Sequence, residues 1–169
     1  MKCCVAMAAI ALLSACSDDG APEITINEIM ASNSTACADT FGEFDDWVEL
    51  YNSTGKAISL ENYAIADDAG AVSKAVLPAD LEVPAKGYLL IWLDEQVQGV
   101  DHLPFKLDAD GDAITLYAPD GSEVDSYSWT RAQQNKSLAR VPDGSGEFTT
   151  CGTSSCGASN GTGCARTAP

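Results

Sequence analysis

Two groups of acidic residues have the chemistry of cation ligands. The first group occupies one polar stretch and comprises Asp39, Glu43, Asp45 and Asp46. The second occupies the shorter run Asp108-Ala109-Asp110-Gly111-Asp112. Calcium prefers several carboxylate oxygens on a tight, glycine-containing turn. Both stretches are therefore candidate calcium sites, because a cation would relieve the repulsion among packed carboxylates.

Each acidic stretch also has an interpretation without a metal. An EF-hand loop that starts at Asp108 needs a bidentate Glu at its twelfth position, where the chain has Pro119. A polar turn between two strands explains Asp108–Asp112, and a solvated loop explains the first group. Asp67 and Asp68 could join the first group if their loops share one end of the fold. We expect no cofactor, with calcium as the alternative.

The N-terminal cysteines belong to a targeting segment. Cys16 ends the stretch Leu13-Ser14-Ala15-Cys16, which follows Lys2 and an apolar run at residues 5–13. The stretch resembles the lipobox of bacterial lipoproteins, and the apolar run is too short to span a bilayer. We expect residues 1–15 to be a lipoprotein signal peptide, Cys16 to carry the lipid, and residues 16–22 to form a short tether. An ordinary secretory signal with a chance cysteine is the alternative.

Four cysteines follow Cys16, namely Cys37, Cys151, Cys156 and Cys164. An even number in an exported protein predicts two disulfides, and three pairings are open. Zinc is disfavoured, since the single histidine, His102, lies far from Cys151 and Cys156 in the sequence.

The charge and the motifs of the chain exclude several classes of function. Lys and Arg number 9 against 25 Asp and Glu, which gives a net charge of −16. Such a surface repels a phosphate backbone, so we expect no nucleic-acid partner. The chain has no G-x-S-x-G motif and no phosphate-binding loop, and no nucleophile motif lies near His102. We expect that the protein is not an enzyme, with a hydrolase built on paired carboxylates as a minor alternative.

The elements that position these residues are short strands. Residues 45–52 alternate, so that Val48 and Leu50 point to one face and Trp47, Glu49 and Tyr51 to the other. The second face could bind a carbohydrate or a peptide through its exposed aromatic rings. The alternative is that these rings pack in the core or at an edge.

Similar strands recur about every 8–15 residues, with Gly, Pro, Asn or Asp turns between them. This spacing predicts an all-β sandwich or a small barrel. From residue 152 onward the chain is rich in Gly, Ser, Thr and Cys. Such a segment can be ordered only by disulfides or by docking on the domain.

Several stretches together resemble one known family. They include Ile26-Asn27-Glu28-Ile29-Met30, Asp46-Trp47-Val48-Glu49-Leu50-Tyr51-Asn52 and Ser137-Leu138-Ala139-Arg140-Val141. Their order and spacing over residues 24–160 resemble the lamin-tail domain. The resemblance implies an immunoglobulin-like β-sandwich without shared catalytic residues. We expect this sandwich at residues 23–150 and a Cys/Gly/Ser-rich segment at residues 151–169.

The anchor and the resemblance together lead to an expected function. We expect a non-catalytic binding or scaffolding module at the bacterial cell envelope, with an envelope protein as its partner and a membrane contact through the lipid. A calcium-dependent adhesion module that uses the acidic loops is the alternative. Ser17, rather than Asp, follows Cys16. By resemblance to lipoprotein sorting signals, this favours the outer membrane or the cell surface over the inner membrane.

Overall fold

The computed structural model describes residues 22–67, 75–96, 98–161 and 164. The prediction of an all-β sandwich is confirmed, since these residues form strands and no helix. None of the described residues therefore belongs to a helix that could cross a membrane. The strands are β1 (Ile24–Met30), β2 (Asp46–Asn52), β3 (Ile58–Ser59), β4 (Ala64–Ala66), β5 (Ala75–Val76), β6 (Glu82–Val83), β7 (Tyr88–Leu93), β8 (His102–Leu103), β9 (Asp112–Tyr117), β10 (Glu123–Trp129), β11 (Ser137–Val141) and β12 (Glu147–Cys151).

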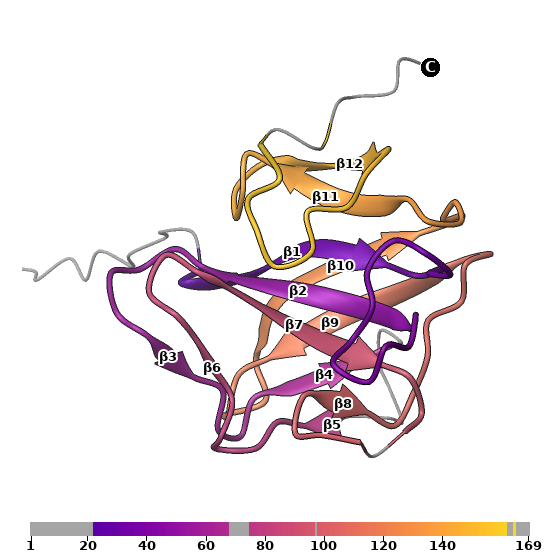
Figure 1. Ribbon diagram of the computed structural model, residues 1–169. Helices are drawn as coiled ribbons and strands as arrows, with labels where there is room; N and C mark the ends of the chain where they lie inside the picture. Colours follow the sequence, from indigo (N-terminus) through magenta and orange to yellow (C-terminus); the bar gives the residue numbers. More distant parts are fainter. Residues whose placement is uncertain (1–21, 68–74, 97, 162–163, 165–169) are drawn as a thin grey trace, which may run out of the picture.

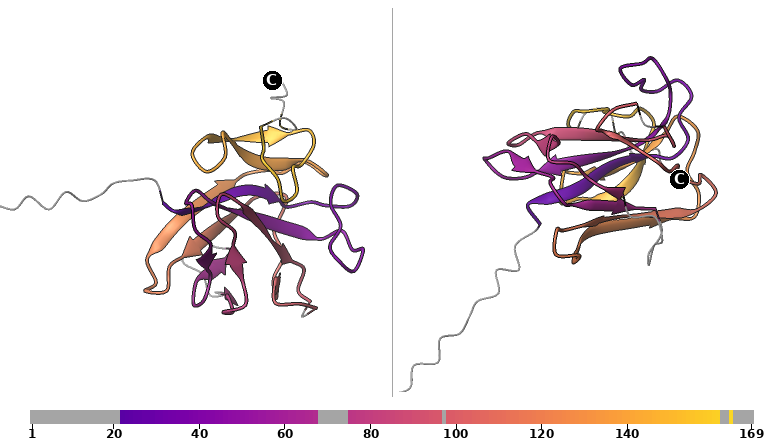
Figure 2. Two further views of the ribbon diagram at one scale, coloured as in Figure 1. Left: turned by 60° about the vertical axis from the view of Figure 1, so that its left-hand side comes forward. Right: turned by 90° about the horizontal axis from the view of Figure 1, so that it is seen from below.

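Two main sheets pack face to face (Figure 1). The larger sheet has the order β12-β11-β1-β2-β7-β8, and the smaller has the order β10-β9-β4-β5. The short strands β3 and β6 pair with each other beside them. Within the larger sheet only β7 and β8 run parallel. Figure 2 shows the same two layers of strands from two other sides.

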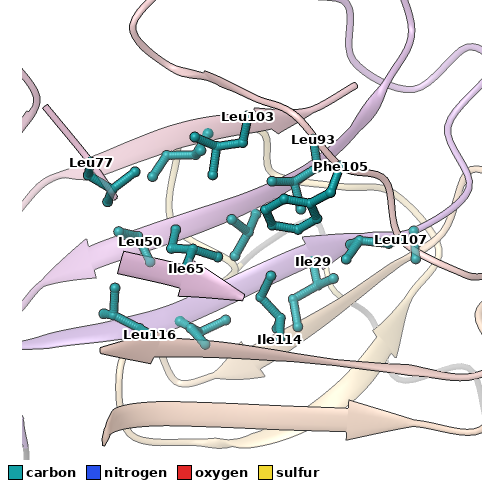
Figure 3. Close-up of a cluster of buried hydrophobic side chains, with 14 of the residues drawn as sticks. Ile29, Leu50, Ile65, Leu77, Leu93, Leu103, Phe105, Leu107, Ile114 and Leu116 are labelled. Atoms are coloured by element: carbon teal, nitrogen blue, oxygen red, sulfur yellow. The ribbon is translucent and has the colours of Figure 1, made fainter. Parts of the chain in front are cut away.

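The core fills the space between the two main sheets (Figure 3). Val48 and Leu50 on β2 belong to one buried cluster with Ile114 and Leu116 on β9. The predicted inward face of residues 45–52 is therefore confirmed. Burying a side chain of this kind stabilises a fold by about 1.5–3 kcal/mol. Burial of this cluster therefore contributes much of the free energy that holds the two sheets together.

A bulge at Asn27 changes the alternation of β1. The pairing of β1 with β2 shifts register between Ile26 and Glu28, which leaves Asn27 as an extra residue. Because of this shift, Ile26 and Ile29 both enter the core although they are three residues apart. Glu28 then lies opposite Glu49 on β2, and both side chains are directed away from the core.

The outer face of the larger sheet carries a second buried cluster. Two chain segments cover this face, namely the loop of residues 31–45 and the segment that follows β12. In Figure 1 the segment after β12, coloured yellow, descends over β1. The cluster consists of Met30, Cys37, Trp47 and Trp92, with Leu90 and Cys156 packed against it. The part of the outer face that carries this cluster is therefore buried and is not an open surface.

Candidate functional site

Two buried glutamates hold the C-terminal segment on the larger sheet. Glu28 and Glu49 are fully buried. Glu28 accepts the Ser155 N–H at 3.1 Å and the Ser155 hydroxyl at 2.5 Å. Glu49 accepts the Gly157 N–H at 2.7 Å and the Asn27 amide at 2.8 Å. The segment of residues 155–160 is thus fastened through its own backbone, which explains how a stretch with so few apolar side chains becomes ordered.

A third carboxylate completes this arrangement, which we call the latch: Glu28, Glu49, Asp143 and the segment of residues 155–160. Asp143 accepts hydrogen bonds from Asn160 N at 3.0 Å, from the Ser159 hydroxyl at 2.5 Å and from the Tyr88 hydroxyl at 2.9 Å. The latch therefore joins β1, β2 and β7 to residues far away in the sequence.

Burial and hydrogen bonding act in opposite directions on the carboxylates of the latch. Burial raises the pKa of Glu49 to about 8, and the Glu28 charge adds to this, while the bonds from Asn27 and Gly157 oppose it. Burial also disfavours the charged form of Asp143, but its four hydrogen-bond donors outweigh that effect and lower its pKa. Glu49 is therefore protonated near neutral pH, whereas Asp143 is ionised.

The latch corrects the expectation of an exposed surface at Trp47, Glu49 and Tyr51. Trp47 and Glu49 are fully buried, because the latch and the loop of residues 31–45 cover the outer face of β2. Tyr51 is half-buried and packs against Tyr88, with ring centroids 5.0 Å apart. The aromatic rings of Trp47 and Tyr51, which could have met a ligand, are packed against other parts of the chain, as in the alternative interpretation.

The prediction of two disulfides is confirmed, and the structure decides the pairing. Cys37 pairs with Cys156, and Cys151 pairs with Cys164, with Cα–Cα distances of 6.4 and 4.4 Å. The first bridge ties the loop of residues 31–45 to the latch. Both bridges fasten the segment after β12, in agreement with the expectation that disulfides and docking order it. Cys16, the signal peptide at residues 1–15 and the tether up to residue 21 lie outside the described residues.

Three acidic side chains of the first predicted group come together, and we call these three the Asp39 group. In the described part of the chain, Asp39, Glu43 and Asp45 form the one group of three potential metal ligands whose ligand atoms lie within 4.8 Å of one another. Asp46 does not belong to this group. Its Oδ2 accepts the Leu107 N–H at 3.2 Å. Burial raises the pKa of Asp46 to about 6. Asp46 thus fastens the start of β2 to the segment before β9.

The second predicted group uses its carboxylates within its own turn. Asp108 Oδ1 accepts the Asp110 N–H at 2.8 Å, and Asp112 Oδ2 accepts the Asp108 N–H at 2.9 Å. This geometry is that of a polar turn. Asp67 lies close enough to raise the pKa of Asp112, although burial of Asp112 is the larger cause. Asp67 is therefore near the second group, and Asp68 lies outside the described residues.

The connection from β7 to β8 brings further polar residues to the Asp39 group. The imidazole Nδ1 of His102 hydrogen-bonds Asp94 Oδ2, and its Nε2 lies 4.0 Å from Asp39 Oδ2. Glu43 Oε2 accepts the Gln98 amide at 2.7 Å. Sequence reasoning assigned no strand at His102, but the residue lies on β8 beside β7. Since β8 is only two residues long, its sequence carried no alternation that could reveal this position.

The loop of residues 31–45 also exposes two phenylalanines. Phe41 and Phe44 have exposed fractions of 58% and 44%. The rings of Phe41 and His102 form a T-shaped pair, with centroids 5.7 Å apart. Figure 2 shows this loop projecting from the body of the domain. A shallow groove of about 370 Å³ runs beside the loop and is lined in part by Asp39, Trp92 and Asp101.

The chain matches the model of a known protein family. The family model described as Lamin Tail Domain matches residues 18–131, which is more than half of the chain. No curated protein matches the chain. The matched residues include the Asp39 group, Glu28 and Glu49, whereas Asp143 and the rest of the latch follow them in the sequence.

Proposed function

Because this chain belongs to the lamin tail domain family, an immunoglobulin-like family without shared catalytic residues, we propose that it is a non-catalytic binding module. In this proposal a lipid on Cys16 anchors the protein to the bacterial cell envelope, at the outer membrane or the cell surface. The tether after Cys16 reaches roughly 20 Å at most when fully extended, which would keep the domain near its membrane. The proposed partner is another envelope protein.

The observation that carries this proposal is the exposure of Phe41 and Phe44 on a fastened loop. The Cys37–Cys156 bridge fixes one part of the loop, and Asp39 fixes the turn that leads to Phe41. Exposed apolar side chains on a fixed loop favour docking, since little conformational entropy is lost on binding. The acidic surroundings favour a partner with an apolar pocket and a basic rim.

The surroundings of His102 support a role without catalysis. A histidine that acts as a general base needs a nucleophile within hydrogen-bond reach. In the described part of the chain, His102 is bonded to Asp94 and faces Asp39 and Asp101, and no Ser or Cys is bonded to it. A hydrolase built on carboxylate pairs stays a minor alternative, and turnover on a substrate panel would reveal it.

Site-specific photo-crosslinking tests the proposed binding site. A photoreactive residue at Phe41 in the full-length protein, expressed in its own host, should capture one envelope protein. Val76 is a matched control, because it is apolar and 64% exposed on β5. Phe41→Asp together with Phe44→Asp should abolish the complex, and Val76→Asp should leave it intact. Equal capture from both positions, or capture that survives the Phe substitutions, would overturn the proposed site.

The proposed anchor has its own test. Cys16→Ser should move the protein from the membrane fraction to the soluble fraction and remove its acyl label. Retention of the variant in the membrane fraction would contradict lipid anchoring.

Calcium-dependent adhesion is the second candidate function. The convergence of Asp39, Glu43 and Asp45 close to Phe41 favours it. It differs from the first candidate in its response to chelation, since excess EDTA should then abolish capture at Phe41.

A further inference from the structure

The carboxyl group of Asp39 has one buried oxygen without a hydrogen-bond partner among the described residues. Asp39 Oδ1 accepts the N–H groups of Phe41 and Glu43, both at 2.8 Å. The Asp39 side chain is fully buried. Its other oxygen, Oδ2, is buried and finds no hydrogen-bond partner among the described residues. Leaving a buried charged oxygen without a partner is costly, so Oδ2 needs a donor or a cation.

Two more oxygens near this turn are in the same state. Asp45 Oδ2 and Gln98 Oε1 are buried, and neither has a hydrogen-bond partner within the described ranges. The ligand atoms of Asp39, Glu43 and Asp45 lie within 4.8 Å of one another. Gln98 joins them through its amide, which donates to Glu43 Oε2 at 2.7 Å. The unsatisfied oxygens therefore belong to residues that lie together or are joined by a hydrogen bond.

The electrostatics of the cluster also favour a bound cation. The pKa of Asp45 is raised, first by burial and then by the negative charges of Asp94, Glu43 and Asp39. Lys106 offsets only part of this effect. A divalent cation held among these carboxylates would remove their mutual repulsion and offset the cost of burying them.

We propose that Asp39, Glu43 and Asp45 bind a calcium ion, with the Gln98 amide oxygen as a further ligand. These donors are all oxygens, which are the ligands that calcium takes, six to eight at a time. Glu43 is exposed, so water can complete the coordination. Magnesium is less well matched, because it keeps most of its own water and demands a strict octahedron.

His102 would have to supply the nitrogen ligand that zinc or copper prefers, and one of its two ring nitrogens already forms a hydrogen bond. His102 Nδ1 is bonded to Asp94, and its Nε2 faces Asp39 and Asp101 at 4.0 and 3.9 Å. A single imidazole nitrogen beside carboxylates is a poor match for zinc, which prefers several Cys or His ligands.

A bound calcium ion would join two segments that are far apart in the sequence. Asp39, Glu43 and Asp45 belong to the loop before β2, and Gln98 belongs to the connection between β7 and β8. The ion would also fix the turn that presents Phe41. The site stands on this geometry alone and does not depend on the proposed partner.

Calorimetric titration of the oxidised, chelator-treated full-length protein with calcium chloride tests the proposal. We expect one ion per chain with a Kd of about 0.1–1 mM, the range of extracellular calcium modules. At ten times Kd, the Tm should rise by about 3–6 °C. No binding up to about 10 mM would overturn the proposal, and an equal response to magnesium or a preference for zinc would overturn the calcium assignment.

Matched variants locate the ion. Asp39→Asn keeps the Oδ1 acceptor for the two N–H groups of the turn, and Glu43→Gln changes an exposed side chain that is tolerant of substitution. Each should weaken calcium binding at least tenfold while the circular dichroism spectrum stays that of the wild type. Asp110→Asn removes the same charge from the other acidic turn and should leave Kd unchanged. Equal weakening by all three variants, or loss of binding in Asp110→Asn alone, would overturn the assignment.

Discussion

Glu49→Gln is the sharpest test of how the latch is held. Glu49 uses both oxygens as acceptors, for Asn27 at 2.8 Å and for Gly157 at 2.7 Å. Glutamine has the same shape, but its amide nitrogen cannot accept a hydrogen bond, whereas the hydroxyl oxygen of a protonated glutamate still can. Asn27 cannot turn its amide over without losing the bond from Gly144 N to its Oδ1 at 2.9 Å. One buried donor is left without a partner, which should cost about 1–3 kcal/mol.

The pH dependence of this loss follows from the pKa of Glu49. Burial raises that pKa from 4.5 to about 8 in the folded protein. Since the folded pKa lies above the unfolded one, the contribution of protonated Glu49 is fully present below the unfolded pKa. It is lost as the pH rises toward about 8, with a limiting slope of about 1.4 kcal/mol per pH unit. The Glu49→Gln variant lacks this slope, so the wild type should lose its advantage over the variant as the pH rises.

Urea unfolding of both proteins, oxidised and followed from about pH 5 to pH 8.5, measures this difference. Asp46 and the other carboxylates titrate in both proteins and cancel in the comparison. Glu61→Gln serves as a control, because Glu61 is exposed, and its stability curve should stay parallel to that of the wild type. Parallel curves for the wild type and Glu49→Gln would refute the claim that a buried, protonated carboxyl group fastens the segment.

Three further predictions concern stability and are measured by the same unfolding experiment. Leu116→Ala removes a fully buried side chain from the core and should cost about 2–5 kcal/mol; a loss below 1 kcal/mol would contradict the described packing. Cys37→Ala with Cys156→Ala removes the bridge between loop and latch and should cost about 2–5 kcal/mol, with faster proteolysis of the loop as a second readout. Arg140→Lys loses the paired bonds from Nη2 to Asp125 at 2.8 and 3.1 Å, and should cost about 1–3 kcal/mol; an unchanged midpoint would show that the pair is not stabilising.

The larger part of the fold could be predicted because sheet alternation is a local signal. Val48 and Leu50 alternate with larger and polar side chains, and the core receives them as expected. The bulge in β1 was not predicted, although the spacing of Ile26 and Ile29 departs from a period of two. A one-residue insertion reverses the direction of every later side chain in a strand. For this reason, Glu28 was not recognised as the partner of Glu49.

The candidate site was predicted less well, for a physical reason. Alternation tells which side chains leave the sandwich core, but it does not tell whether water or another segment receives them. Trp47 and Glu49 leave the core as predicted and then meet residues that follow more than one hundred positions later. The charge pattern located the Asp39 group, since its members are near one another in the sequence. It could not add Gln98, because only the three-dimensional fold brings that residue close.

The covered outer face restricts where a partner can bind. An open sheet of this kind would offer β1, β2 and β7 as a broad docking surface. Here the latch occupies that surface with hydrogen bonds to three carboxylates and a disulfide. A partner that displaced the latch would leave Glu28 and Glu49 without their backbone donors, at a cost of several kcal/mol. Contact through the projecting loop requires no such displacement, because Phe41 and Phe44 are already exposed. The loop of residues 31–45 is therefore a surface where a partner can bind while the latch stays in place.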